Sequence, residues 1–328
     1  MREDEKLRRK VRLDKLGLFR SQSFLERLHG TPLDAHNKSR VQNKQSEASA
    51  ALLLNYQALD IGLGNGAFSD VYLFQARQNA KMRYAVKIMF KEDLNPDILQ
   101  LVNEEVSILA MLDHSNIVKY IESYEDDTNL FIVMEYLEDA TELQKLINQK
   151  QEEMDKDPAR KAESLFKEDE VCRVMRMIFG GLHHIHSNNV VHRDMKPENC
   201  LLDKDGQVRI IDFGLSKMVQ HAEEGQFLMG TPYFLAPEVH ELEGANEAYR
   251  QPLDCWSAGV LMYHMISGKY PFDKPDLTEK ICTGYVEFYD DRFRNISSHA
   301  KDLIRKLLTK DVEVRCTAQN ALQHEFFK

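Results

Sequence analysis

Two short polar segments in the middle of the chain restrict its fold and chemistry more than any other feature. Residues 192–199 read HRDMKPEN, and residues 212–214 read DFG. They supply two carboxylates, one ammonium group and one amide oxygen, from Asp194, Asp212, Lys196 and Asn199. Such a set suits phosphoryl transfer, because in that reaction the protein mainly positions the reactants and neutralises charge.

Each of these four groups has a separate expected task. Asp194 would orient a substrate hydroxyl and accept its proton, and Lys196 would lie against the transferred phosphate. Asn199 and Asp212 would bind Mg²⁺ or Mn²⁺, because both ions prefer oxygen ligands. The two segments therefore predict metal-dependent phosphoryl transfer.

Five motifs resemble those of the eukaryotic protein kinase family and stand in the same order. A glycine-rich segment (LGNGAFSDVYLF, 63–74) and a strand lysine (AVK, 85–87) precede HRDMKPEN and DFG, and APE follows at residues 236–238. The resemblance covers residues 56–328. It implies an α+β fold of two lobes, with ATP bound at their interface.

The lobes implied by the resemblance divide the chain near residue 137. A small lobe with an antiparallel sheet and the hinge would occupy residues 56–137, and a mainly helical lobe would occupy residues 138–328. Residues 1–55 are polar and mildly basic, and we expect an extension that is mostly loop or loosely helical. A charged insertion near residues 149–164, within a segment longer than in similar kinases, is expected to be a mobile surface feature.

The glycine-rich segment is expected to hold the phosphates of ATP. Gly64 and Gly66 would let backbone N–H groups approach the phosphates, and Phe68 would cover the tip of the loop. Val71 would lie over the adenine. Ser69 stands where the family has a third glycine, which is a common variant of its calcium/calmodulin-regulated branch.

Lys87 matches the family's lysine that binds the α- and β-phosphates, and it would pair with a glutamate of the next helix. Glu104 and Glu105 are both candidates. The apolar spacing of that helix favours Glu105, which leaves Glu104 as a surface charge. The resemblance adds the remaining nucleotide-binding positions: Leu63, Ala85, Met134, Glu135, Leu137, Glu142 and Leu201.

Further positions match structural residues of the family. Asp254 would accept hydrogen bonds from the catalytic-loop backbone, and Arg315 would form a buried ion pair with Glu238. His192, Phe213 and Thr231 complete this structural set. His183, His184 and His186 lie near His192 and raise the alternative of a metal site, which we disfavour because 183 and 184 point to different helix faces.

The chain resembles, within the family, the Ser/Thr kinases of the calcium/calmodulin-dependent group, above all the calcium-dependent kinases of protists and plants. GAFS, GTPYFLAPE and ALQHEFF carry this likeness. Every catalytic position is filled, which favours an enzyme over the alternative of a kinase-fold scaffold that binds nucleotide without turnover. GTPYFLAPE belongs to the family's peptide-docking segment and disfavours a small-molecule phosphotransferase.

A calcium-sensing partner, or another regulatory partner, is also expected. The EF-hand pattern does not occur in the 328 residues, so a calcium response would need such a partner or a longer form of the chain. Leu7–Phe19 has the basic and apolar character of a docking helix, although Asp14 and Gly17 favour a solvated segment.

Charge and composition favour an intracellular, cytoplasmic protein that acts on basic protein substrates. Residues 1–50 hold 12 Lys and Arg against 7 Asp and Glu, which leaves a net charge of −15 for residues 51–328. This acidic body disfavours nucleic acid and attracts basic peptides, although a merely solvated acidic surface is an equal alternative. The five cysteines lie apart, and no apolar run suggests a membrane span.

Two segments carry regulatory hypotheses, one because of a serine and the other because of its glutamates. In LGLFRSQSF, Ser23 has Arg20 three residues before it and Phe24 after it, so it is a candidate autophosphorylation site, or the stretch occupies the substrate groove; the alternative is a serine that stands near an arginine without such a role, as is common in polar tails. Between Ser216 and Thr231 there is no Ser, Thr or Tyr. Glu223 or Glu224 could supply there a permanent negative charge; the alternative is that both are solvated.

Overall fold

The computed structural model describes residues 47–66, 69–94, 96–157, 160, 162–218, 232–240 and 251–328. The described residues divide into two units. One consists of residues up to Leu99 together with Tyr120–Tyr136, and the other of Gln100–Lys119 together with Leu137–Lys328. Each unit is considered by itself below.

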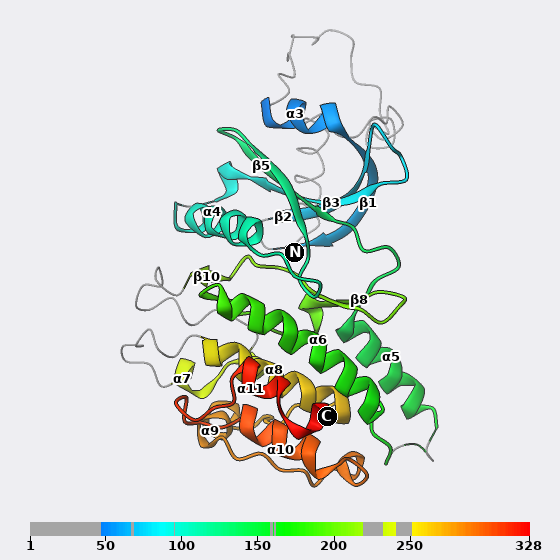
Figure 1. Cartoon of the computed structure of the whole chain (residues 1–328), viewed down its shortest axis with the longest axis vertical. Helices are drawn as coiled ribbons and strands as arrows, with labels where there is room; N and C mark the ends of the chain where they lie inside the picture. The colour runs from blue at the N-terminus through cyan, green and yellow to red at the C-terminus, as the bar shows by residue number, and fades with distance from the viewer. Residues whose placement is uncertain are drawn as a thin grey trace, which may run out of the picture. The chain divides into compact units, whose positions relative to one another are not determined.

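A five-stranded antiparallel sheet, in the order β1-β2-β3-β5-β4, forms the first unit (Figure 1). Its strands are β1 (Tyr56–Asn65), β2 (Ser69–Ala76), β3 (Arg83–Phe90), β4 (Tyr120–Glu125) and β5 (Asn129–Glu135). A short 3₁₀ helix, η1 (Lys91–Asp93), and helix α4 (Pro96–Met111) follow β3. The interior strand β5 is buried from Asn129 to Val133, as its apolar run predicts for a strand covered on both faces.

Helix α3 (Glu47–Asn55) covers one face of this sheet (Figure 1). Ala48 and Leu52 are buried with apolar side chains of β2, β3 and β5, so one face of this helix belongs to the core of the first unit. Residues 47–55 were expected to lie in the polar extension, as loop or loose helix, and the structure shows instead a helix with one buried face. Ala and Leu favour a helix, but nine residues are too few to hold one in isolation, so burial of one apolar face is what stabilises it.

The second unit contains most of the helices. They are α5 (Leu143–Asp155), α6 (Glu168–Ser187), α7 (Pro237–His240), α8 (Gln251–Ser267), α9 (Leu277–Thr283), α10 (Ser298–Leu307) and α11 (Ala318–Leu322). Short 3₁₀ turns are η3 (Pro197–Asn199), η5 (Pro232–Phe234), η7 (Asp291–Phe293) and η8 (Glu325–Phe327).

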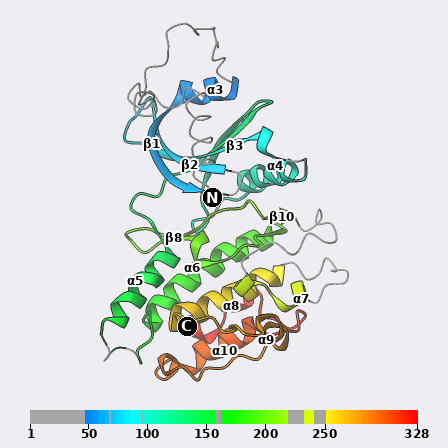
Figure 2. The ribbon, with the colours of Figure 1, turned by 180° about the vertical axis from the view of Figure 1, so that it is seen from behind.

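Helix α8 is the centre of this unit, because every residue from Asp254 to Ser267 is buried. Helices α6 and α10 pack against it (Figure 2). Gly259 permits the close approach of α10: a Cβ atom there would lie 2.8 Å from the Cβ of Leu307. A helix that is apolar on all sides is expected at such a position.

The helices around α8 begin at sequence signals. Ser297 accepts a hydrogen bond from the backbone N–H of Ala300 and caps α10. In α6, the Glu170 carboxylate accepts a hydrogen bond from the Lys167 N–H at 2.8 Å, and acidic residues fill the first turn. These signals fix where α6 starts, and α6 leads directly into the catalytic loop.

The charged insertion is anchored at its two ends, and the mobility of its middle stays a prediction. Helix α5 runs through Gln151, whose Oε1 accepts a hydrogen bond from Arg292 Nη1 at 2.8 Å, and Met154 is buried. At the other end, Leu165 is buried and its N–H donates to the Ile266 carbonyl at 2.8 Å. A few apolar side chains among many charges were enough to anchor it.

Short strands hold the loops of the second unit. Strand β7 (Val190–Val191) pairs with β10 (Lys217–Met218), and β8 (Cys200–Leu202) pairs with β6 (Thr141–Glu142) and β9 (Val208–Ile210). Residues 192–199 therefore lie between β7 and β8. Among the described helices, none combines the length and the apolar character that crossing a membrane requires.

Candidate active site

Asp194 is the centre of a hydrogen-bonded cluster in the loop between β7 and β8. Its Oδ2 accepts from Lys196 Nζ at 2.6 Å and from Asn199 Nδ2 at 3.0 Å. Asn199 Nδ2 also donates to the Asp194 carbonyl at 2.8 Å. The structure thus brings together the three residues predicted to be catalytic, with Asp194 nearly buried.

Asp254, at the start of α8, holds the backbone of this loop. Its Oδ2 accepts from the His192 N–H at 2.8 Å and its Oδ1 from the Arg193 N–H at 2.8 Å. His186 Nε2 lies 2.9 Å from the same Oδ2. Burial alone would raise the pKa of Asp254, but the hydrogen bond and charge of His186, with the charge and backbone N–H of His192, lower it.

His192 and Phe213 link the catalytic loop to the DFG segment. Their rings meet edge to face with centroids 4.9 Å apart, and Phe213 is fully buried. His192 Nε2 lies 3.1 Å from the Ile211 carbonyl oxygen, and Ser216 Oγ donates to the His192 carbonyl at 3.2 Å. The position of Asp212 is therefore tied to that of Asp194 through packed neighbours.

Two residues of these segments have positive φ angles, at 68° for Arg193 and 62° for Asp212. For residues other than glycine this conformation is uncommon and costs of order 1–3 kcal/mol, and it persists where surrounding contacts enforce it. The hydrogen bond from the Arg193 N–H to Asp254 is such a contact.

The donor atoms at Asn199 and Asp212 fit a hard divalent cation. Both hydrogen bonds of the Asn199 amide nitrogen go to Asp194, which leaves its Oδ1 oxygen as the ligand atom. Asp212 adds a carboxylate. Oxygen donors of this kind are preferred by Mg²⁺ and Mn²⁺.

In the first unit, four predicted nucleotide-binding residues share one face of the sheet. Val71 of β2 pairs with Lys87 of β3, and Ala85 of β3 pairs with Met134 of β5. Directly paired residues project on the same side of a sheet, and so do residues two apart on one strand. Glu135, the last residue of β5, pairs with Tyr84.

The described part of the glycine-rich segment forms the end of β1 and the beginning of β2. Gly64 pairs with Val71, and Leu63 beside it is exposed. The Gly66 N–H donates to the Ser69 carbonyl at 2.7 Å, and a Cβ atom at Gly66 would lie 2.8 Å from Ser69 Oγ. A side chain at 66 would therefore require Ser69 Oγ to move, whereas nothing lies within 4 Å of a Cβ at Gly64.

The remaining nucleotide-binding candidates lie in the second unit. Glu142 of β6 pairs with Leu201 of β8, and Leu137 follows β5. Glu105 of α4 is 2% exposed, whereas Glu104 is half-buried and accepts from Gln100 at 3.2 Å. The choice of Glu105 as the inward-facing acid agrees with this burial. Its pairing with Lys87 stays a prediction.

Three residues that support the loop were not expected from the sequence. His186 was expected at most as a metal ligand, and Ser216 only as the start of the segment up to Thr231. Gln251 had no expected role, although its Nε2 donates to the His186 carbonyl at 2.8 Å. His186 could have been found from the helix, because it ends the buried face of α6 just before the loop. Nearby, His184 stacks on His114 with centroids 5.2 Å apart.

Several predicted positions lie outside the described residues. They are Ser23, Phe68, Glu223, Glu224 and Thr231.

The two units and the loop geometry define a protein kinase fold, α+β in class, and comparison with known families agrees. The chain belongs to the protein kinase family: residues 58–327 match the protein kinase domain. Calcium-dependent protein kinase 4 of Plasmodium berghei (strain Anka) is 34% identical over 281 residues, which cover 83% of this chain and 49% of that protein. Myosin light chain kinase A of Dictyostelium discoideum is 35% identical over 272 residues, 81% of this chain and 86% of the relative.

The chain thus spans about half the length of the Plasmodium relative. Both relatives bear names consistent with the calcium/calmodulin-dependent group to which the motifs pointed.

Proposed function

We propose that the chain is a Ser/Thr protein kinase that transfers the γ-phosphoryl group of ATP to hydroxyl groups of protein substrates. The observation that carries this proposal is the hydrogen-bonded cluster of Asp194, Lys196 and Asn199. These hydrogen bonds fix the orientation of the Asp194 carboxylate toward an incoming hydroxyl group. Family membership and the kinase names of the relatives add support.

In the proposed reaction the substrate oxygen attacks the γ-phosphorus while the bond from that phosphorus to the ADP oxygen breaks. Asp194 orients the hydroxyl and accepts its proton. Lys196, whose ammonium group lies on Asp194, neutralises charge on the phosphoryl oxygens. Lys87 binds the α- and β-phosphates, and the sheet face of Val71, Ala85 and Met134 contacts the adenine.

A divalent cation, Mg²⁺ or Mn²⁺, would supply further neutralisation of phosphate charge. Asn199 Oδ1 and the Asp212 carboxylate would hold it. Their oxygen chemistry supports this assignment.

Basic protein segments are the proposed substrate class. Glu142 and Glu198 are the acids that would receive a substrate arginine by charge-assisted hydrogen bonds. Glu198 Oε2 is buried and has no hydrogen-bond partner among the described residues. Burial raises the pKa of Tyr270, and the negative charge of Glu198 raises it further. A buried carboxylate oxygen without a hydrogen bond gains most from a positively charged donor, so Glu198 favours a substrate arginine. Lys145 lies 2.6 Å from Glu142 and would have to move aside.

The decisive experiment is a phosphorylation assay with ATP, Mg²⁺ and an arginine-containing serine peptide. We expect turnover by the unaltered protein and a loss of about 10²–10⁴-fold in Asp194→Asn. Asp205→Asn is the matched control, because Asp205 is an exposed aspartate of the same unit and should leave turnover unchanged. Full turnover by Asp194→Asn, or nucleotide binding without any turnover, would favour the scaffold alternative.

We also propose a calcium-sensing regulatory partner and an intracellular, cytoplasmic location. The proposed partner rests on the name of the calcium-dependent relative. The proposed location rests on the five cysteines, because all of them carry free thiols and thiols stay reduced in the cytosol. Adding calcium-loaded calmodulin to the peptide assay tests the partner: at least a severalfold change in rate is expected, and an unchanged rate would count against this sensor.

A further inference from the structure

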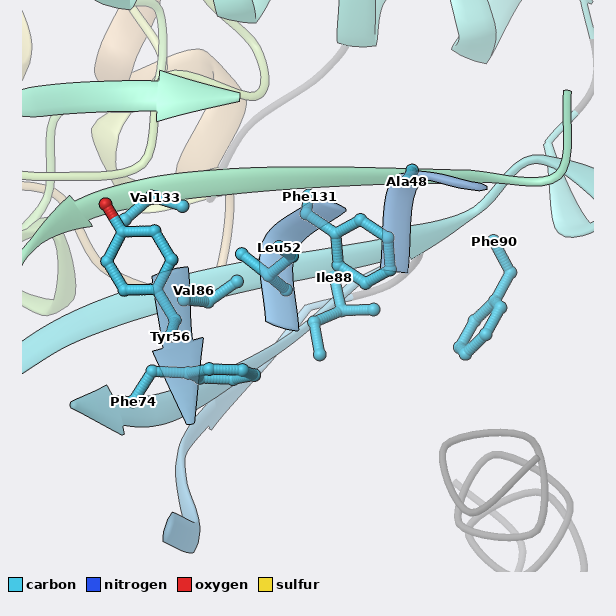
Figure 3. Packing of buried hydrophobic residues seen from close by; sticks show 9 residues of the cluster. All are labelled: Ala48, Leu52, Tyr56, Phe74, Val86, Ile88, Phe90, Phe131 and Val133. Atoms are coloured by element: carbon cyan, nitrogen blue, oxygen red, sulfur yellow. The ribbon is translucent and has the colours of Figure 1, made fainter. Parts of the chain in front are cut away.

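Helix α3 lies against the sheet face opposite to the one that carries Lys87. Figure 3 shows the Leu52 side chain of α3 among those of Val86, Ile88 and Phe131. Val86 and Ile88 flank Lys87 on β3, and side chains alternate along a strand, so Lys87 projects from the other face. The helix therefore supports β3 from behind at the position of the lysine.

Both ends of α3 are held by charged residues from distant parts of the first unit. Asp126, in the turn between β4 and β5, accepts a hydrogen bond from the Ala48 N–H at 2.8 Å. Arg77, just after β2, donates from Nε to the Leu53 carbonyl at 2.6 Å. A carboxylate at the first turn and a guanidinium at the last one oppose the helix dipole. A nine-residue helix is marginal alone, so these contacts and its buried face keep it in place.

The helix also connects the two edge strands of the sheet. It continues directly into β1, whose first residue, Tyr56, donates from its hydroxyl to Glu122 of β4 at 2.5 Å. At the same junction Asn55 Nδ2 donates to the Tyr124 hydroxyl of β4 at 2.9 Å. Because β1 and β4 are the edges of the order β1-β2-β3-β5-β4, α3 spans the sheet across β3.

We propose that α3 is a positioning element for nucleotide binding, and that Leu52 is the positioning residue through which it acts on Lys87. The inference rests on the proposed function of Lys87. With Leu52 in place, Val86 and Ile88 are fully buried and β3 cannot shift toward that face. Without it, the strand gains room behind the lysine, and interiors packed like crystals transmit such changes to their neighbours.

Leu52→Ala tests the proposal, and Leu54→Ala is its matched control. Leu54 is on the same helix but 78% exposed, whereas Leu52 is fully buried. At a temperature well below unfolding, we expect Leu52→Ala to raise KM for ATP about tenfold, because small displacements of a binding group cost much affinity. KM for the peptide should stay unchanged. Leu52→Met, which refills the space, should restore KM for ATP, and Leu54→Ala should match the unaltered protein.

A merely structural helix would lower the thermal unfolding temperature of Leu52→Ala without changing its KM for ATP, and that result would overturn the proposal. Lys87→Met separates the two hypotheses. Normal KM for ATP in Lys87→Met would refute the proposed function of the lysine itself, and the positioning inference with it. A defective Lys87→Met beside a normal Leu52→Ala would refute the positioning alone. If Leu52→Ala does not fold, Leu52→Val carries the same comparison, and an unchanged KM for ATP in it counts against the proposal.

Discussion

Arg315 and Glu238 form a bidentate ion pair, with Nη1 2.6 Å from Oε1 and Nη2 2.8 Å from Oε2. The remaining N–H groups of Arg315 donate to the carbonyl oxygens of Thr309, Pro252 and Lys310. All five donors of the guanidinium are thereby used, and the side chain is fully buried. Arg315 thus connects residues 236–238 (APE) to the start of α8 and to the segment that follows α10.

Removing this arginine should destabilise the second unit strongly. We expect Arg315→Ala to lower the free energy of unfolding by about 3–5 kcal/mol, because it leaves a largely buried carboxylate without its partner. Arg315→Lys should recover only part of this, since an ammonium group cannot bind bidentately. Urea unfolding measures both. Arg294→Ala is the control, because its pair with Asp291 is mostly exposed and worth about 0–1 kcal/mol; equal losses in the two variants would contradict the expectation.

The contribution of Asp254 to stability should depend on pH. The pKa of this carboxyl is lowered in the folded protein, so its stabilisation is present above its ordinary value and is lost as the pH falls through the folded value. The difference in unfolding free energy between the unaltered protein and Asp254→Asn should be largest near neutral pH and shrink below about pH 4. Unfolding titrations at several pH values test this. If the difference in unfolding free energy grew as the pH fell, the pKa of Asp254 would be raised in the folded protein, which contradicts the prediction.

Turnover should depend on a hard divalent cation. Mg²⁺ or Mn²⁺ should support phosphorylation and Zn²⁺ should not, because Asn199 and Asp212 offer only oxygen ligands. Asp212→Ala should abolish turnover while the circular dichroism spectrum stays native, with Asp205→Ala as the control. Substantial phosphorylation in excess EDTA would speak against the metal assignment.

Activity should be insensitive to phosphatase treatment. The activation segment has no hydroxyl residue between Ser216 and Thr231, and Glu223 or Glu224 would replace a phosphate opposite Arg193. Treated and untreated enzyme should therefore show nearly the same rate. A loss greater than about tenfold that no other phosphosite explains would refute a permanent charge. Glu223→Gln and Glu224→Gln, made singly, would identify which carboxylate acts.

Ser23 should become phosphorylated when the protein is incubated with ATP and Mg²⁺. Leu18, Arg20 and Phe24 surround it with the pattern that similar kinases favour in substrates, and Glu142 and Glu198 are the proposed acceptors of Arg20. Mass spectrometry would detect the modification, with Asp194→Asn as the control. An unmodified Ser23, together with an unchanged rate and peptide affinity in Arg20→Ala, would exclude both versions of the hypothesis.

The sequence alone predicted the fold class and the cluster around Asp194. HRDMKPEN places a carboxylate, an ammonium group and an amide within six residues, so local backbone geometry is enough to bring them together. Short β-rich runs likewise indicated that Val71, Lys87 and Met134 lie in strands, and the resemblance to the protein kinase family implied their roles. Such features are carried by short stretches of neighbouring residues, which a sequence displays directly.

Contacts between distant residues were decided only by the tertiary structure. Nothing in EASAALLLN indicates that Asp126 caps this helix from 78 residues away or that Leu52 lies behind Lys87. The packing of the charged insertion depends in the same way on Arg292 and Ile266, far along the chain. A short segment folds stably only when another element offers a complementary surface, and that surface exists only once the sheet or helix bundle has formed.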